Sequence, residues 1–295
     1  MNTLNKTLVI STSANNTMGY KKIKSCGTLN PHKNADQNLM KYQSRILILL
    51  MMFTMATLEV QGQSTSKDDL IKEAGEKFEA GDEERALQLY EEVLEMDPEH
   101  FEALWNASIM HAREGYRKED ESDQEEWFQK AVDLAEKAVE YHPEKGHSHY
   151  ALAVAKGRLS VLKGTRDRIS VAHEIRDHLQ KASEYEPEFA PIWHLWGVWH
   201  SDVANISSAE RAAASLISEG IPDADNETAE EYLKKAIELD SEHILFRLDL
   251  ARHYLEIGEA EKAKETLQKL LDLEPQTKDD PGKLNEAKEL LEDLG

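Results

Sequence analysis

The sequence predicts an all-α fold: a right-handed α-solenoid of about five helical hairpins, with inserts in the middle hairpins and a capping helix at the C-terminus. Two observations predict it. The first is that five segments end alike, as EVLEMDPEH, KAVEYHPEK, KASEYEPEF, KAIELDSEH and KLLDLEPQT. The second is that four of these endings contain a proline, which cannot continue a helix and therefore begins the next turn or helix. Helical units that repeat in this way stack on one another and bury a continuous core.

The hairpins can be assigned in order along the chain. The first spans 67–98 and the fifth spans 244–275, and both are compact, with Gly81 and Gly258 at their turns. The other three hairpins are longer because they contain inserts, and they span 101–143, 146–187 and 190–241.

Each insert has its own character. The first, EGYRKEDESDQEE, is highly charged and is expected to form a solvated loop or a helix extension, and the second, KGTRDRIS, is basic. The third, ISSAERAAASLISEGIPDADNETAEE, predicts an extra helix, because Ser207 and Glu210 have the spacing of a capping box. After Pro275, the segment DDPGKLNEAKELLEDL predicts a helix with a polar outer face, which is what the cap of a solenoid requires.

The first and fifth hairpins resemble the tetratricopeptide family, whose unit is about 34 residues long. In the fifth, Ala251 and Tyr254 lie on the first helix and Ala263 and Leu267 on the second, so that small residues allow close approach and large ones fill the space between helices. The chain also resembles the regulator-of-microtubule-dynamics family over roughly 68–294, most closely toward the C-terminus. The features are the long middle repeats, a tryptophan-bearing helix before an Ala/Ser-rich insert, LARHYLEIGEAEKAKETLQKLLDLEP and the closing EAKELLEDL. The resemblance implies a tetratricopeptide-like fold, with an N-terminal hydrophobic anchor in some members.

Two segments precede the repeat domain, which is expected to span 63–295. Residues 40–62 have the layout of a secretory signal peptide: a basic start, the apolar run 46–58, and Gly62, near which cleavage is expected. The apolar run is shorter than the about 20 residues of an ordinary membrane span. Residues 1–39 are polar and aperiodic, and we interpret them as a non-native or disordered extension. The protein is therefore expected to be exported, either periplasmic or secreted. The alternative is a membrane anchor formed by the apolar run.

Charge limits the partners of this chain. It has 57 acidic against 35 basic residues and a net charge of −22. Such a surface repels nucleic acid and anionic lipid at long range, although an acidic surface can also serve only to keep an exported protein soluble. The family name implies microtubule binding, but tubulin is itself strongly acidic, and only the short KGTRDR stretch offers local positive charge. The sequence therefore argues against both nucleic acid and microtubules as partners.

The sequence shows no catalytic or metal-binding motif. The single Cys26 precedes the predicted signal peptide, so the repeat domain has neither a thiol nucleophile nor a disulfide. His173 and His178 are five residues apart, whereas zinc-binding histidines on one helix face are four apart. Glycine-rich phosphate loops and G-x-S-x-G elbows are absent from the sequence. We therefore predict a protein that is not an enzyme, with no catalytic residue, metal or cofactor.

The function that these observations leave is the binding of a partner in the concave groove of the solenoid. In tetratricopeptide arrays, the second, fifth, ninth and twelfth residues of each first helix face this groove, and the lysines, arginine and asparagine of the family's carboxylate clamp are not matched here. The resemblance instead implies a largely apolar and aromatic lining, with the partner-binding residues Trp105, Ile109, Tyr150, Val154, His194, Val198, Leu248 and Arg252. Such a lining suits a peptide or an amphipathic helix. The alternative is that the inserts and the cap fill the groove themselves.

Two functions fit this reading. The first is a scaffold that binds a partner peptide or helix in the apolar groove, and the alternative is a carrier of a lipid or another apolar small molecule within the solenoid.

The stretch APIWHLWGVWHSD, residues 190–202, bears on the same question. Trp193 and Trp196 are expected to pack in the core, with Gly197 at a small packing position. Trp199 is expected outside both core and groove, under the third insert. These placements would leave His194 and Val198 to face a ligand.

Overall fold

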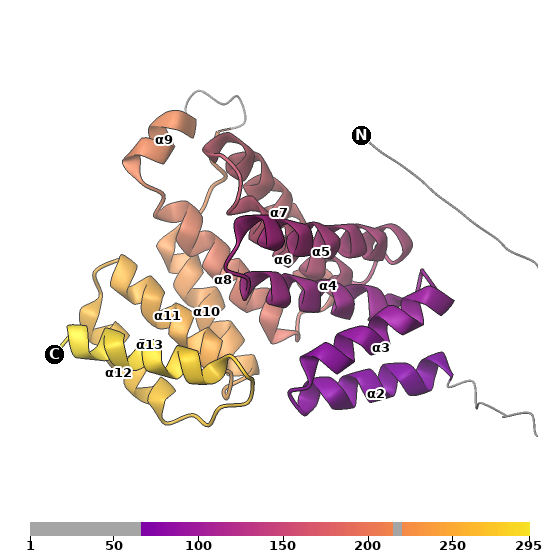
Figure 1. Ribbon diagram of the computed structural model, residues 1–295. Coiled ribbons are helices and arrows are strands. Elements are labelled where there is room, and N and C mark those ends of the chain that lie inside the picture. Colours follow the sequence, from indigo (N-terminus) through magenta and orange to yellow (C-terminus); the bar gives the residue numbers. More distant parts are fainter. Residues whose placement is uncertain (1–65, 215–219) are drawn as a thin grey trace, which may run out of the picture. The chain divides into compact units, whose positions relative to one another are not determined.

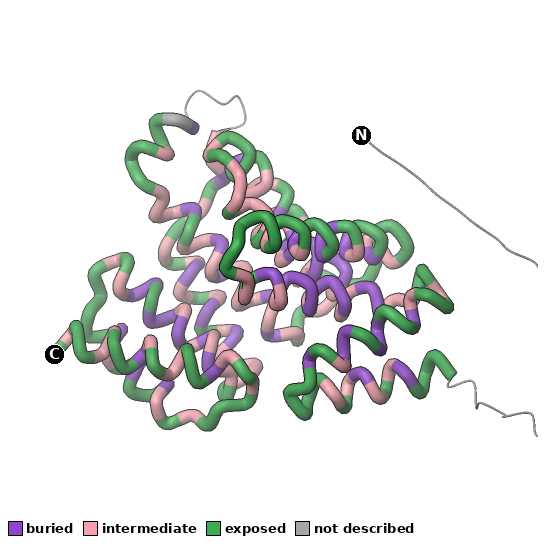
Figure 2. The backbone as a smooth tube through the Cα atoms, in the orientation of Figure 1, coloured by how far each residue is buried: buried purple, intermediate pink, exposed green. Residues whose placement is uncertain are grey.

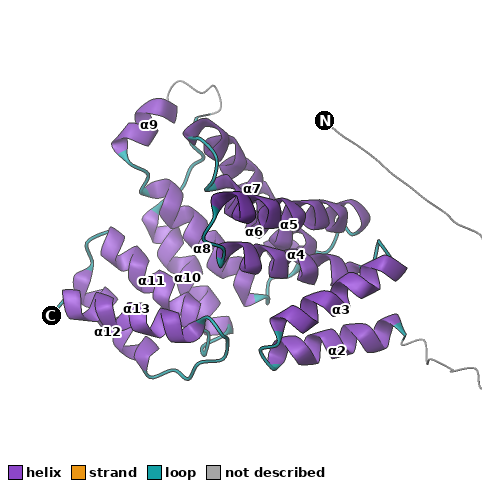
Figure 3. Cartoon of the chain, in the orientation of Figure 1, coloured by secondary structure: helices purple, strands orange, loops and turns teal. Residues whose placement is uncertain are grey.

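The computed structural model describes residues 66–214 and 220–295, which form twelve helices without a strand in the described part (Figures 1 and 3). The compact helical unit spans Thr65–Gly295. The predicted extension 1–39 and signal peptide 40–62 lie outside the described residues. The helices are α2 (Lys67–Glu79), α3 (Glu83–Met96), α4 (Phe101–Tyr116), α5 (Glu121–Tyr141), α6 (Gly146–Ser160), α7 (Thr165–Tyr185), α8 (Ala190–Ala204), α9 (Ser208–Ala214), α10 (Asn226–Leu239), α11 (Ile244–Glu256), α12 (Ala260–Leu271) and α13 (Asp280–Asp293).

Five helical hairpins follow one another along the helical unit: α2–α3, α4–α5, α6–α7, α8–α10 and α11–α12. The last helix, α13, packs on both helices of the fifth hairpin (Figure 1). The predicted all-α solenoid of five hairpins and a C-terminal cap is therefore confirmed. We call α2, α4, α6, α8 and α11 the first helices. Neighbouring first helices contact each other where α4 meets α6 and where α8 meets α11.

Local sequence explains where the helices begin and turn. Ser66 begins α2 with a capping box, because its hydroxyl accepts from the Asp69 backbone while the Asp69 carboxylate accepts from the Ser66 backbone. Gly81 and Gly258 occupy the tight turns of the first and fifth hairpins at a φ of 80°. A side chain would strain the backbone at this φ, so glycine is required at both turns.

The inserts take the forms that their sequences indicate. The first two are helix extensions, because α5 and α7 are each 21 residues long while the second helices α3 and α12 have 14 and 12. The third insert forms the predicted extra helix α9, which packs against α7. Ser207 and Glu210 form the expected capping box at its start, with the Ser207 hydroxyl 2.8 Å from the Glu210 carboxylate.

The core lies between the two helices of each hairpin and between neighbouring hairpins, as the alternating buried and exposed segments of Figure 2 indicate. Gly197 shows how tightly α8 and α10 meet. A Cβ at this position would lie 2.6 Å from the Leu233 side chain and 2.9 Å from its backbone nitrogen. The expected small packing position is confirmed, because only glycine allows this approach.

The tryptophans of α8 are arranged differently from the expectation. Trp199 is the buried one, 5% exposed, and it donates a hydrogen bond to the Ala172 carbonyl of α7. The prediction that it lies outside the core is wrong, although Ile221 of the third insert does pack against its cluster. Trp193 and Trp196 are only partly buried and stack on each other. The cause is the extended α7, which covers the face of α8 that carries Trp199.

Candidate functional site

The first part of the groove is filled by the protein's own aromatic side chains. Phe189, which immediately precedes α8, lies between the predicted groove residues Trp105 and Tyr150, at ring-centroid distances of 6.3 and 5.3 Å. His147 of α6 stands 4.3 Å from Phe189 and 4.8 Å from Trp105. The structure thus brings Trp105 and Tyr150 into one cluster. The cluster occupies the space that a ligand would need there.

The C-terminal part of the groove is covered by the cap. His194 of α8 is 2.7 Å from a carboxylate oxygen of Asp249 on α11, whose other oxygen accepts from Arg252 at 2.6 Å. Arg252 also donates to Glu286 of α13 at 2.6 Å. Burial opposes the charge of Asp249, but the hydrogen bonds and charges of His194 and Arg252 outweigh burial and hold the pKa of Asp249 below its usual value. The predicted His194 and Arg252 therefore bind each other through Asp249.

The apolar residues predicted for the groove mostly belong to the core. Leu248 is fully buried in a cluster that includes Ala287 of α13, so the prediction that it lines the groove is wrong. It fails because the cap packs over this face of α11. The remaining three are partly buried and pack against neighbouring clusters: Ile109, Val154 and Val198.

The ends of the first helices α4, α6 and α8 carry exposed side chains. Arg158 of α6 is exposed, and its guanidinium lies 4.3 Å from the ring centroid of Tyr116 at the end of α4. Asp202 of α8 is exposed as well. Neither of the two forms an ion pair or a hydrogen bond with another side chain of the described residues. Two unpaired charges therefore lie on an accessible part of the solenoid.

Both charges are nevertheless crowded by protein. Burial lowers the pKa of Arg158, with the charges of Tyr116 and Asp249 acting in the opposite direction. An arginine remains cationic under such a shift. Burial and the nearby charge of Asp249 raise the pKa of Asp202 to about 6. Because Asp249 acts on both, Arg158 and Asp202 belong to one electrostatic neighbourhood.

A cluster of ion pairs, which we call the clasp, joins the first hairpin, the second hairpin and the cap. Its members are Glu83, Arg113, Glu114, Arg117, Lys278 and Asp279. Glu83 begins α3, and its almost fully buried carboxylate lies 2.7 Å from Arg113 and 2.8 Å from Arg117. Arg117 is also 2.6 Å from Asp279, which immediately precedes α13. The clasp thus connects α3 and α4 with the segment that leads into α13.

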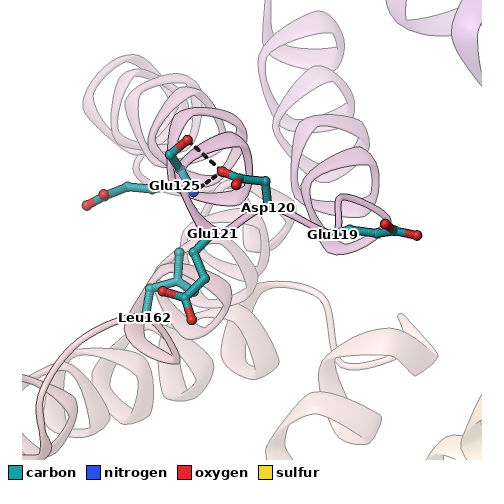
Figure 4. Close-up of a pocket in the computed structure, with 6 residues that line it drawn as sticks. Glu119, Asp120, Glu121, Glu125 and Leu162 are labelled. Atoms are coloured by element: carbon teal, nitrogen blue, oxygen red, sulfur yellow. Dashed lines mark hydrogen bonds between the residues drawn. The ribbon is translucent and has the colours of Figure 1, made fainter.

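A separate hollow lies at the turn between α4 and α5 (Figure 4). It has a volume of about 650 Å³ and is lined by Glu119, Asp120, Glu121, Ser122, Glu125 and Leu162. Asp120 caps α5, since its carboxylate accepts from the Ser122 backbone at 2.8 Å and from the Ser122 hydroxyl at 2.6 Å. Glu125 pairs with Lys163. These contacts account for the arrangement of the hollow without a ligand, so it is not our candidate site.

In residues 66–214 and 220–295, no three histidine, cysteine or acidic side chains converge as ligands for a metal ion. None of the helices in these ranges has the length and apolar character that crossing a membrane requires.

Sequence reasoning missed three parts of this arrangement. Phe189 could have been found, because it is the only large apolar residue at this position among the five helix stops. The equivalent residues after the other four are His100, Lys145, His243 and Thr277. Asp249 carries no such signal, since acidic residues are abundant in this chain. The clasp carries none either, because Arg113 and Asp279 are separated by more than a hundred residues.

The hairpin array places the chain among the tetratricopeptide-like helical repeat proteins. A crystal structure of a thermophilic TPR protein in Thermus thermophilus superposes with a TM-score of 0.56, at 20% identity, over 77% of this chain and 99% of that one. The likeness concerns the fold.

The family follows from the sequence comparison. The profile of the family Regulator of microtubule dynamics protein 1-3 matches residues 70–295, and the chain belongs to this family. Regulator of microtubule dynamics protein 1 of Bos taurus is 26% identical over 76% of this chain and 71% of its own length. Regulator of microtubule dynamics protein 3 of Xenopus laevis is 24% identical over 81% of this chain and 51% of its own length.

Proposed function

We propose that this protein is a non-enzymatic scaffold that binds a protein partner, as a peptide or a helix, at the open end of its groove. The observation that carries the proposal is the exposure of Tyr116 and Val161, 63% each, at the ends of α4 and α6. Tyr116 lies against the unpaired Arg158. Large apolar side chains exposed beside unpaired charge, on a rigid scaffold, are typical of a surface that a partner covers.

The proposal moves the binding residues away from those that the repeat register indicates. Trp105, Tyr150, His194 and Arg252 contact one another or the cap and are largely used within the protein. The surface left for a partner is formed by Tyr116, Val161, Arg158 and Asp202. The fold itself supports the scaffold class, since solenoids of helical repeats present extended surfaces for binding.

Site-specific photo-crosslinking in the full chain tests this proposal. A benzoylphenylalanine at Tyr116 is expected to form a covalent adduct with a partner protein when the variant is expressed in its own host and irradiated. The matched control is the same residue at Tyr141, the last residue of α5, which is 42% exposed. Adducts at both positions in equal yield, or at neither, would contradict a binding surface at the groove end.

A lipid or apolar small-molecule carrier is the second class of function that the sequence allows. The side chains that would line its cavity, such as Trp105 and Val154, pack against their neighbours, so no specific observation favours it. Native mass spectrometry of protein purified from its own host separates the two classes. A bound lipid that dissociates on denaturation would contradict the scaffold proposal.

The names of the relatives raise microtubules as a partner. We leave them out of the proposal because a chain with a net charge of −22 is repelled by the acidic surface of tubulin. Co-sedimentation with microtubules at low ionic strength is the test. We expect the protein to stay in the supernatant, and pelleting that is abolished by salt would contradict the charge argument.

We propose further that the protein is exported after cleavage near Gly62. The support is the sequence of residues 40–62, whose apolar run is too short for an ordinary membrane span. Mass spectrometry of the protein's N-terminal peptide decides between export and anchoring. A mature chain that begins close to Gly62 agrees with export, and a chain that keeps residues 46–58 and sediments with membranes contradicts it.

A further inference from the structure

All five first helices carry a charged residue at the thirteenth position, counted from the first residue of each helix. In α2 this residue is Glu79, and from α4 onward the residues are Arg113, Arg158, Asp202 and Glu256. We call the four residues from α4 to α11 the charge row. It is positive over the second and third hairpins and negative over the fourth and fifth.

Members of the charge row act on their neighbours in the array. The charge of Arg113 contributes to lowering the pKa of Arg158, after the larger effect of burial. Burial and Asp249 are the largest effects that raise the pKa of Asp202, and the charge of Arg168 lowers it. The charge of Glu256 raises it by a smaller amount than Arg168 lowers it. Like charges therefore stand side by side in each half of the row. This arrangement costs stability, because each neighbour disfavours the ionised form of the other.

Only Arg113, at one end of the charge row, forms ion pairs within the described part of the protein. Arg113 pairs with Glu83 at 2.7 Å and with Asp279 at 3.2 Å in the clasp. Arg158, Asp202 and Glu256 are exposed and have no ion pair with any of the described residues. Elsewhere in this groove, crowded charges do find partners, as Asp249 does with His194 and Arg252. Arg158 and Asp202 are thus crowded by protein and still lack an ion pair among the described residues, unlike Asp249.

A ligand of complementary charge would explain them. A carboxylate placed on Arg158 can accept two parallel hydrogen bonds from the guanidinium, which already lies against the Tyr116 ring. An ammonium or guanidinium group placed at Asp202 would relieve the repulsion between Asp202 and Glu256. The acidic exterior of the chain, with a net charge of −22, attracts the basic part of such a ligand at long range.

We propose that the groove end binds a peptide segment with charges of both signs in a fixed order, an acidic residue at Arg158 and a basic residue at Asp202 and Glu256. This inference rests on the proposed function and specifies the chemistry of the partner. The peptide lies along the ends of α6, α8 and α11 and covers Tyr116. Its polarity along the array is set by the order of the charge row.

The test uses random peptides displayed on phage as the probe and the full chain as the bait. The wild-type chain is expected to enrich peptides in which an acidic and a basic residue occur in one order at one spacing. The double variant R158E/D202K reverses both charges and is expected to enrich the opposite order. Both residues are exposed and unpaired, so we expect the variant to fold, with an unchanged circular dichroism spectrum.

A synthetic peptide of the enriched sequence then gives affinities. The single variants R158E and D202K are each expected to weaken its binding about tenfold or more, and R158E/D202K is expected to bind the charge-swapped peptide more tightly than the original. The matched control is R176E/D133K, which reverses two exposed charges on the second helices α7 and α5. This control is expected to retain the wild-type affinity and charge order.

Three outcomes overturn the inference. They are enrichment without a preferred charge order, an order that R158E/D202K leaves unchanged, and a failure of the wild-type chain to enrich any peptide. The crosslink at Tyr116 is read independently. Its presence with any of these outcomes refutes the charge order alone, whereas its absence refutes the proposed function as well.

Discussion

The beginnings and the ends of the first helices differ in how their side chains are used. At their beginnings, Trp105, His147 and Tyr150 meet Phe189 and fill the groove with aromatic contacts. At their ends, Arg158 and Asp202 stand exposed and unpaired. The same helices therefore provide a closed part that stabilises the array and an open part that is free for a partner. Groove residues taken from the repeat register alone point to the closed part.

The clasp adds a third element to this comparison. Arg113 and Arg158 occupy equivalent positions on successive first helices, yet Arg113 is fixed by Glu83 and Asp279 while Arg158 has no ionic partner in the described part of the chain. The same residue type at the same position thus serves structure in one repeat and is left free in the next. Substitutions that separate the two roles test the account.

The largest expected loss of stability comes from removing an aromatic side chain that fills the groove. Phe189→Ala removes the ring that contacts His147, Tyr150 and Trp105. Loss of the transfer free energy, together with the cavity left behind, is expected to lower the free energy of unfolding by about 3 kcal/mol. Urea denaturation followed by circular dichroism measures it. Tyr141→Ala, which removes an exposed ring on α5, is the control and should cost about 0.5 kcal/mol or less. Equal losses in both variants would contradict a filled groove.

The next effect comes from opening the clasp. Glu83→Ala removes the buried carboxylate that Arg113 and Arg117 share. We expect a loss of about 2 kcal/mol, because two guanidinium groups then keep only part of their compensation. Glu84→Ala, at the neighbouring exposed position of α3, is the matched control. Hydrogen exchange followed by mass spectrometry should show faster exchange at the start of α13 in the first variant only. Unchanged exchange there would mean that the clasp does not hold the cap.

Acid is expected to weaken the third hairpin through a pair of histidines. His149 and His178 are joined by a hydrogen bond of 2.9 Å between their Nδ1 atoms, which requires that one of these nitrogens is unprotonated. Burial, followed by the nearby His149, lowers the pKa of His178 to about 4. Between pH 6.5 and 4, the unfolded chain therefore binds a proton that the folded chain does not. Stability is full above pH 6.5 and falls with acidification through this window, by about 2 kcal/mol once the effect is reduced for the partial exposure of the imidazole.

His178→Gln checks this assignment, because glutamine cannot take up the proton. Unfolding free energies at about pH 7 and about pH 4.5 should differ less in the variant than in the wild-type chain. His243, whose pKa burial also lowers to about 4, keeps part of the acid sensitivity in both. An identical pH dependence of the two proteins would remove the His149–His178 contact as its cause.

The smallest effect is expected at the open end. Arg158→Met is predicted to change the free energy of unfolding by less than about 1 kcal/mol, since the guanidinium loses only its contact with the Tyr116 ring. Arg117→Met is the matched comparison, because the same change there removes ion pairs to Glu83 and Asp279. It is expected to cost about twice as much or more. If Arg158→Met were the more destabilising of the two, Arg158 would be a structural residue and not a free one.

The sequence allowed the array to be predicted because its signals are local and repeated. Each of these signals determines the structure of only a few neighbouring residues. They are the helix stops, the turn glycines Gly81 and Gly258 and the capping pair Ser207–Glu210. The position of Trp199 could not be predicted in this way, because it depends on how far the extended α7 reaches across α8. The covering of Leu248 by α13 likewise depends on the angle at which the cap returns.

The candidate site, too, could be predicted only where the signals are local in the sequence. The register placed Trp105, Tyr150, His194 and Arg252 on the groove side of the first helices, where they do meet one another or the cap. The register could not show that the protein's own side chains would occupy these residues, since Phe189 comes from the start of the next hairpin and Glu286 from the cap. Unpaired charges are recognised only when every possible partner has been located in space, so the charge row became apparent from the structure alone.

The reactivity of single cysteines tests the central claim, a groove that is closed at one end and open at the other. In a Cys26→Ser background the chain has no other thiol. Arg158→Cys and Asp202→Cys are predicted to react with a maleimide at nearly the rate of Asp133→Cys, an exposed position on α5. Leu248→Cys should react at least about tenfold more slowly, because its reaction requires local opening of the fold. Slow labelling at positions 158 and 202 would contradict the open end, and fast labelling at 248 would contradict the closed one.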